Sequence, residues 1–327
     1  MQYLESGSTD PAFNLALEQY VFDTLAQNDE FFMLWQNRDA VIVGLHQNTI
    51  EEVNRGFLEK NGIPAVRRLS GGGAVFHDLG NLNFTFITRE PNPETIDFDR
   101  SCRPIAEALK SMGVEVVFHG RNDMTIDGRK FSGNARYYKD KKLMHHGTML
   151  FDTDFEKMAE ALRVPDDKLV SKGIKSVRSR VTNIREHLPE DMAMAEFWDL
   201  IRKYIAGNMP LYPLSSQERG AVDVIRRERY GTWEWNYGLS PKFSIEKRRR
   251  IENFGAIRLS MSVENGKIAA FATDGDYFGT KTCRDVAAAL MGVKLEKDAL
   301  LAALHGLVLS LYYEGLTADD LVRLILE

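Results

Sequence analysis

The segment that most constrains folding is "MTIDGRKFSG" (residues 124–133), where Asp127-Gly128 separates two short runs of alternating residues. Asp-Gly tolerates the positive φ angles of a two-residue hairpin turn, so the segment predicts two antiparallel strands in one register. The predicted facing pairs are Ile126 with Arg129, Thr125 with Lys130, Met124 with Phe131, and Asp123 with Ser132.

Side chains alternate between the two faces of a strand, so this hairpin has a polar and an apolar face. The polar face carries Asp123, Thr125, Lys130 and Ser132, and the apolar face carries Met124, Ile126 and Phe131. Lys130 and Asp123 become diagonal neighbours, about 7–8 Å apart. That gap is too wide to assume a direct ion pair, but it suits a phosphate and Mg²⁺, which usually takes one or two carboxylates plus substrate phosphates. A hairpin with a solvated polar face is the alternative interpretation.

The other patterns interleave strands and helices without a strict βαβ alternation, which favours a mixed sheet. Asp10-Pro11 predicts a helix start, residues 48–62 predict a helix closed by Gly62, and residues 81–86 alternate with strand period. Trp35, Trp233 and Trp235 are expected in the core, the last two at strand spacing, and the charged run 247–250 is expected to be an exposed linker. The pattern resets near residue 246, so we predict domains of residues 1–245 and 246–327.

Composition narrows the classes of function. The net charge of −5 argues against a general nucleic-acid binder. Two distant cysteines without a CxxC pair predict a reducing, cytoplasmic setting and no structural zinc. No run approaches 18 apolar residues and no signal peptide is visible, so we expect no membrane span.

A run of three glycines follows Ser70, just after Arg67 and Arg68. It lacks the Gly-Lys-Ser/Thr ending of a phosphate-binding P-loop, and a strand is predicted after it where both that motif and the dinucleotide fingerprint need a helix. Bare glycine N–H groups can still hold an anion, and the arginine pair and His77 favour a ligand. A tight bend between strands is the alternative. Residues 170–186 are rich in Lys and Arg without a clear period, which predicts a mobile basic loop.

Five motifs occur in order: "RRLSGGGAVFHDLGN", "GRND", "KFSGNA", "HHGT" and "KGIKSVRSRVTN". In sequence and spacing they resemble the lipoate–protein ligase A family, over nearly the whole chain. The resemblance implies an α+β fold: a mixed-sheet catalytic domain of the biotin/lipoate ligase type, related to class II synthetase cores, with a small α+β C-terminal accessory domain.

The resemblance also implies a two-step reaction. Lipoate and Mg-ATP would give lipoyl-AMP and pyrophosphate, and the lipoyl group would then pass to one lysine of a lipoyl domain. The implied acceptors are E2 subunits of 2-oxoacid dehydrogenases and the glycine-cleavage H protein. The implied cofactors are ATP and Mg²⁺, with no nucleic-acid or membrane partner, and we expect a monomer.

Site residues follow from the motif positions. Lys130 is implied to be the catalytic lysine, contacting both the α-phosphate and the lipoyl carboxyl. The implied ATP-binding residues are Arg68, Gly73, Ala74, Val75, Phe76, Asn122, Asp123, Lys130 and Lys172. The implied lipoate-binding residues are Arg67, Ser70, Gly72, His77, Lys130, Gly133 and His146. Asp123 would hold Mg²⁺ through the phosphates, and residues 172–183 would close over the adenylate.

Alternative functions remain open at this stage. An octanoyl or lipoyl transferase of the same fold would need a reactive thiol in place of ATP. Neither Cys102 nor Cys283 occupies a motif position, and Cys102 is expected to lie away from the motifs. A biotin ligase would carry a Gly-Arg-Gly-Arg-type loop that is missing, and a non-catalytic lipoate-binding protein would not need Lys130 and Asp123.

Overall fold

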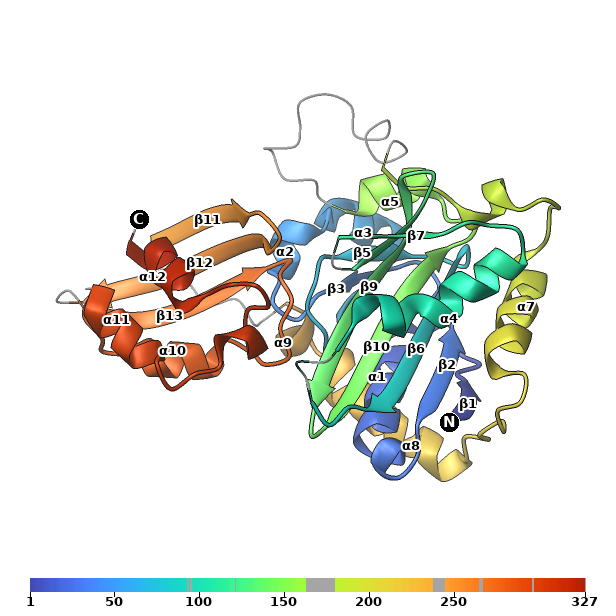
Figure 1. Cartoon of the computed structure of the whole chain (residues 1–327), viewed down its shortest axis with the longest axis horizontal. Coiled ribbons are helices and arrows are strands. Elements are labelled where there is room, and N and C mark those ends of the chain that lie inside the picture. The colour runs from blue at the N-terminus through green and yellow to red at the C-terminus, as the bar shows by residue number, and fades with distance from the viewer. Residues whose placement is uncertain are drawn as a thin grey trace.

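A computed structural model describes residues 1–92, 94, 96–120, 122–162, 180–237, 245–264, 267–295 and 297–326. Its largest element is a seven-stranded sheet in the order β1-β2-β6-β10-β9-β8-β7 (Figure 1). The strands are β1 (Gln2–Glu5), β2 (Phe31–Trp35), β6 (Asn81–Arg89), β7 (Val117–His119), β8 (Asp123–Ile126), β9 (Arg129–Lys139) and β10 (Lys142–Leu150). β1 and β2 are parallel and the other pairs are antiparallel, which confirms the predicted mixed sheet.

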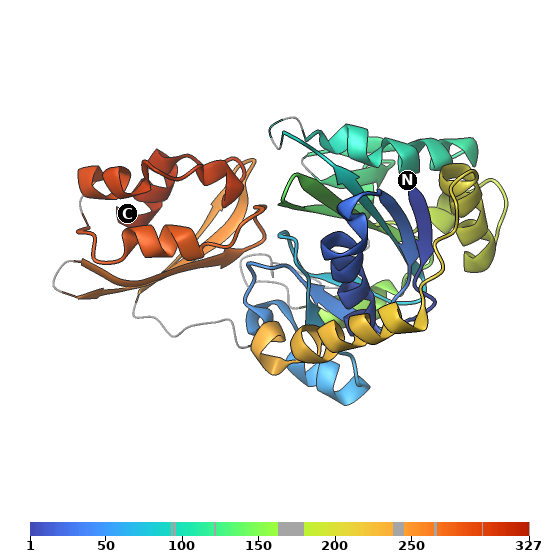
Figure 2. The same ribbon diagram turned by 90° about the horizontal axis from the view of Figure 1, so that it is seen from below.

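The C-terminal part forms its own layer beside the large sheet (Figure 2). Its antiparallel strands are β11 (Ile245–Ile251), β12 (Gly255–Glu264) and β13 (Lys267–Gly275). Its helices are α10 (Arg284–Leu290), α11 (Lys297–Leu304), α12 (Ala318–Leu326) and the 3₁₀ turn Leu309–Leu311. These elements share a hydrophobic cluster separate from those of the large sheet. The charged run 247–250, expected to be a linker, lies instead within β11.

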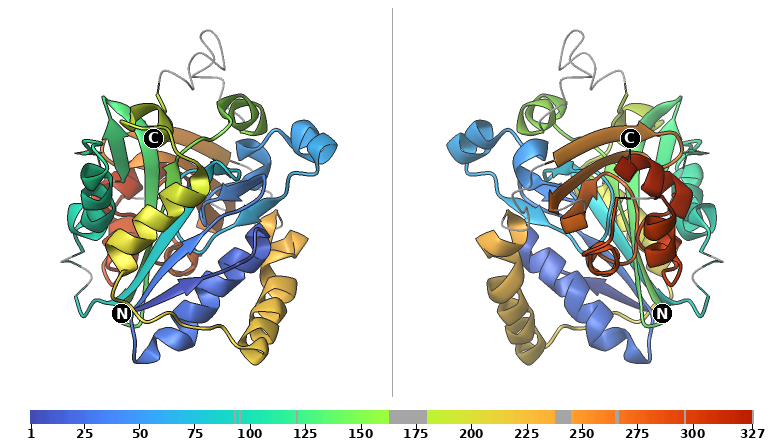
Figure 3. Two further views of the ribbon diagram at one scale, coloured as in Figure 1. Left: turned by 90° about the vertical axis from the view of Figure 1, so that its right-hand side faces the viewer. Right: turned by 90° about the vertical axis from the view of Figure 1, so that its left-hand side faces the viewer.

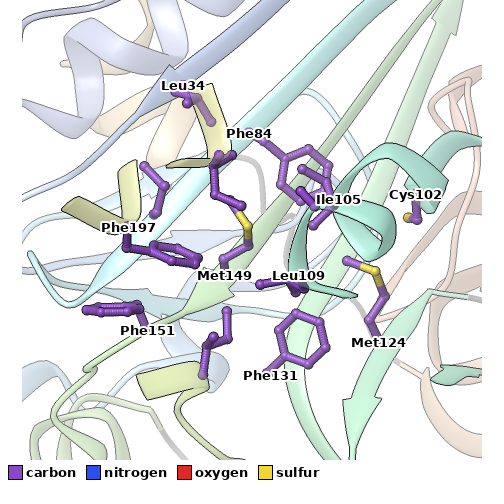
Figure 4. Packing of buried hydrophobic residues seen from close by; sticks show 14 of the residues in the cluster. Leu34, Phe84, Cys102, Ile105, Leu109, Met124, Phe131, Met149, Phe151 and Phe197 are labelled. Atoms are coloured by element: carbon purple, nitrogen blue, oxygen red, sulfur yellow. The ribbon is translucent and has the colours of Figure 1, made fainter. Parts of the chain in front are cut away.

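Helices cover both faces of the large sheet (Figure 3). α4 (Phe98–Ser111) and α7 (Met194–Ala206) pack on one face, where Ile105 and Leu109 meet Phe84, Phe131 and the other apolar residues in Figure 4. α1 (Pro11–Asp23) and α8 (Ser216–Ile225) lie on the other side. Asp10 caps α1 by accepting from the N–H groups of residues 12 and 13, as predicted.

A second, three-stranded sheet packs across the α1 side in the order β4-β3-β5. Its strands are β3 (Ala40–Val43), β4 (Ala65–Arg67) and β5 (Val75–His77), and the glycine loop, residues 68–74, joins β4 to β5. α3 (Arg55–Asn61) and α5 (Phe155–Ala161) flank this sheet. The predicted helix over residues 48–62 is two helices, α2 (Thr49–Glu52) and α3, and Gly62 ends α3 at φ 63° as expected.

The hairpin is confirmed at its turn and corrected further along. Asp127 and Gly128 have φ angles of 51° and 74°, and Thr125 faces Lys130 as predicted. A β-bulge then shifts the register, so Met124 faces Ser132 and Asp123 faces Gly133. An extra residue in one strand leaves no local signature in side-chain alternation, so the pattern could not reveal it.

Short helical segments complete the described chain: Leu25–Gln27, Ile184–His187, Arg226–Tyr230 and α9 (Trp233–Asn236). The strand spacing of Trp233 and Trp235 was therefore misleading, and Trp233 is 63% exposed, not in the core. Trp35 is buried as expected. Of the predicted basic loop, residues 170–179 lie outside the described residues, and residues 180–186 are described. Of the helices that the structure describes, none combines the length and apolarity needed to span a bilayer.

Candidate functional site

A cavity of about 100 Å³ lies between the large sheet and the second sheet. The predicted site residues that line it are Arg68, Gly72, Gly73, Ala74, Val75, His77, Asn122, Lys130, Gly133 and His146. Its other walls are Leu15, Trp35, Ile42, Asn83, Asn134, Ala135, Gly147 and Thr148. Arg67, Ser70, Phe76 and Asp123 are not part of this lining, and Lys172 falls outside the described residues.

Asn83, on the polar face of β6, forms part of one cavity wall. Asn83 faces Trp35 on β2 and Thr148 on β10, and the Thr148 hydroxyl contacts the Gly133 backbone on β9. The polar alternation of β6 fits a solvent-facing strand equally well, yet Asn83 is 1% exposed. Because β6 is central and both faces are covered, its polar residues point into the interior. Asn83 and Thr148 were therefore missed, although polar residues on a central strand were the available signal.

Lys130 lies beside the cavity next to a carboxylate. Its Nζ is 2.8 Å from Asp123 Oδ1, so the two groups form the direct ion pair that the predicted spacing did not assume. The bulge sets Asp123 opposite Gly133, and the lysine side chain crosses that glycine: a Cβ there would lie 2.9 Å from Nζ. The Lys130 N–H donates to the Arg180 carbonyl and its carbonyl accepts from the Thr182 N–H, so the backbone is held on both sides.

Arg68 organises the glycine loop from inside. Its guanidinium donates to the carbonyls of Ile42, Gly71 and Gly73 and to Ser70 Oγ, at 2.6–3.2 Å. Burial lowers the pKa of Arg68 to about 10, so the group stays charged at neutral pH. A buried cation surrounded by loop carbonyls fixes the loop's shape and adds positive potential to the cavity wall.

Arg67, the last residue of β4, has a different environment from Arg68, the first residue of the glycine loop. Its guanidinium is 1% exposed and does not line the cavity. It donates to the Thr49 hydroxyl and to the carbonyls of Gly44, Leu45, Gln47, Trp235 and Asn236. Arg67 thus ties together three chain segments behind the second sheet.

The glycines permit close backbone contacts. A Cβ on Gly44 would lie 1.9 Å from the Gly72 carbonyl oxygen, and a Cβ on Gly71 would lie 2.8 Å from the Tyr277 carbonyl oxygen. Gly72 has a φ angle of 93°, and its N–H donates to the Tyr277 carbonyl at 3.1 Å. One N–H predicted to be available for an anion is therefore paired with the C-terminal layer, and Gly73 has no contact that close.

A buried network fixes His146, which lines the cavity. Its Nε2 is 2.6 Å from Ser70 Oγ and its Nδ1 is 3.0 Å from Glu18, which is 1% exposed. The Glu18 carboxylate can only accept, so Nδ1–H donates to it, and in the neutral imidazole Nε2 then accepts from the Ser70 hydroxyl. Ser70 is fully buried and does not line the cavity, so this Ser-His-Glu arrangement orients the imidazole rather than presenting a nucleophile.

Cys102 lies closer to the motifs than expected. Its sulfur is 3.3 Å from His145 Nε2 and 3.5 Å from Asn134 Oδ1, because α4 packs on the strands that carry them. The side chain is fully buried away from the cavity lining, and burial raises its pKa, which keeps it a thiol. Within the described ranges, no three His, Cys, Asp or Glu side chains cluster to hold a metal ion.

Two family descriptions match this chain. Residues 10–206 match the lipoyl protein ligase A/B catalytic domain, and residues 240–325 match the bacterial lipoate protein ligase C-terminus. The chain is 41% identical to the lipoate-protein ligase LplJ of Bacillus subtilis, with 97% of each chain covered. It is 38% identical to lipoate–protein ligase 1 of Staphylococcus aureus, covering 99% of this chain and all of that one.

Solved structures share the fold. LipL1 of P. falciparum, solved in complex with lipoate, superposes with a TM-score of 0.81 at 23% identity over 99% of both chains. A bipartite lipoate protein ligase of Thermoplasma acidophilum, described together with its E2 lipoyl domain, has a TM-score of 0.64 at 27% identity. That match covers 75% of this chain and 98% of the other.

Proposed function

Because this chain belongs to the lipoate–protein ligase family, we propose that it joins lipoate to a lysine of a lipoyl domain in two ATP-dependent steps. In the first step a lipoate carboxylate oxygen attacks the α-phosphorus of ATP, and the bond to the β-phosphate oxygen breaks. The products are lipoyl-AMP and pyrophosphate. In the second step the acceptor amine attacks the lipoyl carbonyl carbon, AMP leaves, and the amine loses a proton as the amide forms.

Lys130 is the catalytic residue in the first step. A carboxylate approaching a phosphate brings two anions together, and a positioned ammonium offsets that repulsion most where negative charge develops in the transition state. Lys130 Nζ is fixed by Asp123 at 2.8 Å and by the missing side chain of Gly133. Placing both reactants beside one fixed cation also makes the attack effectively unimolecular.

The remaining site residues extend this proposal. ATP binds along Arg68, Gly73, Ala74, Val75 and Asn122, and Phe76 and Asp123, which do not line the cavity, support this ATP site from next to it. Lys172, which lies outside the described residues, is a further proposed ATP contact, and lipoate lies along Gly72, His77, Gly133 and His146. Arg67 and Ser70 support the lipoate site from behind, since neither lines the cavity. Mg²⁺ supplies charge neutralisation of the phosphates, and Asp123 is the carboxylate that would hold it, a donor set that fits one or two carboxylates plus phosphates.

The acceptors we propose are E2 lipoyl domains and the glycine-cleavage H protein, and the enzyme acts as a cytoplasmic monomer. The boundary between the catalytic and accessory domains lies near residue 245. The amine of the acceptor must be neutral to attack, so transfer from preformed lipoyl-AMP accelerates as pH rises above 7. A rate that is flat from pH 6 to 9 in single turnover would contradict rate-limiting amine attack.

The observation that carries the proposal is the Lys130 ammonium, held by Asp123 beside a cavity that the glycine loop encloses. The test is ATP–pyrophosphate exchange with lipoate, octanoate, biotin or no acid. We expect exchange with lipoate, none with biotin and none without an acid, and loss of exchange in Lys130→Ala. A wild-type enzyme that supports no acid-dependent exchange would refute the adenylate step.

A further inference from the structure

The cavity wall contains a buried histidine whose tautomer is set by its neighbours. His77 is 2% exposed, and burial lowers its pKa to about 3, so the ring is neutral. Its Nδ1 lies 3.0 Å from Asn37 Nδ2. Asn37 Oδ1 already accepts from Asn14, so Nδ2 is the donor and His77 Nδ1 the acceptor. The ring proton is therefore on Nε2, and within the described residues Nε2–H has no hydrogen-bond partner.

Asn83 supplies a second unpaired donor. Its Oδ1 accepts from Asn81 Nδ2 at 2.9 Å, whereas its Nδ2 is buried and, across the described parts of the chain, unpaired. Both His77 and Asn83 line the cavity, and their other side-chain polar atoms are hydrogen-bonded to Asn37 and Asn81. The two free N–H groups are accordingly the atoms available to a ligand.

Part of the wall around this pair is apolar, although Thr148 faces Asn83 on β10 and His146 lines the same cavity. Trp35 lies directly across from Asn83 in the register, its ring centroid is 6.1 Å from that of His77, and Leu15 and Ile42 complete the wall. A buried donor left unpaired is costly, and few chain atoms here can satisfy it. A ligand segment that brings acceptor atoms into this largely apolar part of the cavity therefore binds more tightly than a plain hydrocarbon of the same length.

We propose that His77 Nε2–H and Asn83 Nδ2–H form a polar subsite that selects an acyl chain carrying a dithiolane over an unsubstituted chain. The inference rests on the proposed function and concerns which acid that site prefers. The two dithiolane sulfurs are polarizable, weakly accepting atoms within an apolar ring, so they suit two N–H donors in an apolar wall. An octanoyl chain offers only C–H groups and leaves both donors unpaired.

The key variants are Asn83→Val and Asn83→Thr. Valine and threonine have nearly the same shape and both suit a strand, but threonine keeps a hydroxyl donor. His77→Phe removes the second donor while keeping an aromatic ring against Trp35. Ile42→Val is the control for cavity shape, since it trims an apolar wall without changing polarity. Thermal unfolding checks that each variant is folded.

The readouts are kcat/KM in pyrophosphate exchange and Kd by calorimetry, each measured with lipoate and with octanoate. We expect Asn83→Val to lower the lipoate-to-octanoate ratio on the order of tenfold, about the cost of one lost hydrogen bond to a buried donor. Asn83→Thr should retain most of the preference, His77→Phe should reduce it, and Ile42→Val should change both acids alike.

The proposal would be overturned if Asn83→Val and His77→Phe kept the wild-type lipoate-to-octanoate ratio. It would also be overturned if the wild type, Asn83→Val and Asn83→Thr all had the same ratio. If the wild type supports no exchange with either acid, the ligase reaction itself fails, and the calorimetric ratio still decides whether the subsite discriminates.

Discussion

Gly133→Ala tests whether the position of the Lys130 ammonium governs the chemistry. The new Cβ would lie 2.9 Å from Nζ, and ordinary contact begins at 3.4 Å, so restoring ordinary contact moves Nζ by 0.5 Å (3.4 − 2.9). Catalytic groups must be held within about 0.5 Å of the productive geometry, and a displacement of about 1 Å can cost about 100-fold. We therefore expect adenylate formation to slow by about 10- to 100-fold.

Stability should respond far less to the same change. The Lys130–Asp123 pair is about one-third exposed on each side, at 34% and 29%, and such pairs contribute at most about 1 kcal/mol. The assay is single-turnover formation of lipoyl-AMP, with thermal unfolding on the same samples. Gly220→Ala in α8 is the matched control, because among the described residues no atom beyond its chain neighbours and the backbone of its own helix lies within 4 Å of the methyl group that alanine would add there. Normal adenylate formation in a folded Gly133→Ala protein would refute the positional argument.

Three further predictions follow from the same structure. Lys130→Ala should abolish adenylate formation and shift the melting temperature little, whereas a drop as large as that of a core truncation would show that the lysine is structural. His46, His77 and His145 are buried and neutral, with pKa values lowered by burial to about 4, 3 and 3. As pH falls below about 6.5, these histidines take up protons in the unfolded chain before they do so in the folded protein. Each histidine therefore removes on the order of 1.4 kcal/mol of folding stability per pH unit until the pH reaches its folded pKa. Urea unfolding at pH 7 and pH 5 measures this loss, and equal stabilities would contradict it. Cys102→Ser should leave the ligase active, because the thiol does not line the cavity; loss of activity in a normally folded variant would revive a thioester mechanism.

The local features of the fold could be predicted where short-range chemistry decides them. The Asp127-Gly128 turn, the cap at Asp10 and the end of α3 at Gly62 each depend on a backbone angle or hydrogen bond within a few residues. The bulge that shifts the register between Met124 and Thr125 could not be predicted, because it depends on how β9 pairs with both β8 and β10. Trp233 failed for a related reason: a two-residue spacing also fits one exposed turn of helix.

The candidate site likewise contains residues that could be predicted from the sequence and residues that could not. Motif positions pointed to Lys130 and the glycine loop, which do border one cavity. Position alone did not separate Arg67, the last residue of β4, from Arg68, the first residue of the glycine loop, although their guanidinium groups bond to different chain segments. Nor did it identify Asn83, since burial of a polar strand face depends on which elements cover the sheet. Residues outside any motif were therefore the hardest to assign.

The hydrogen bond from Gly72 to the Tyr277 carbonyl has a thermodynamic consequence for the whole molecule. One N–H cannot serve two acceptors at full strength, so an anion that takes this donor competes with residues 275–278 for it. Occupancy of the glycine loop and attachment of the C-terminal layer are then linked equilibria, and each must weaken the other by the same factor.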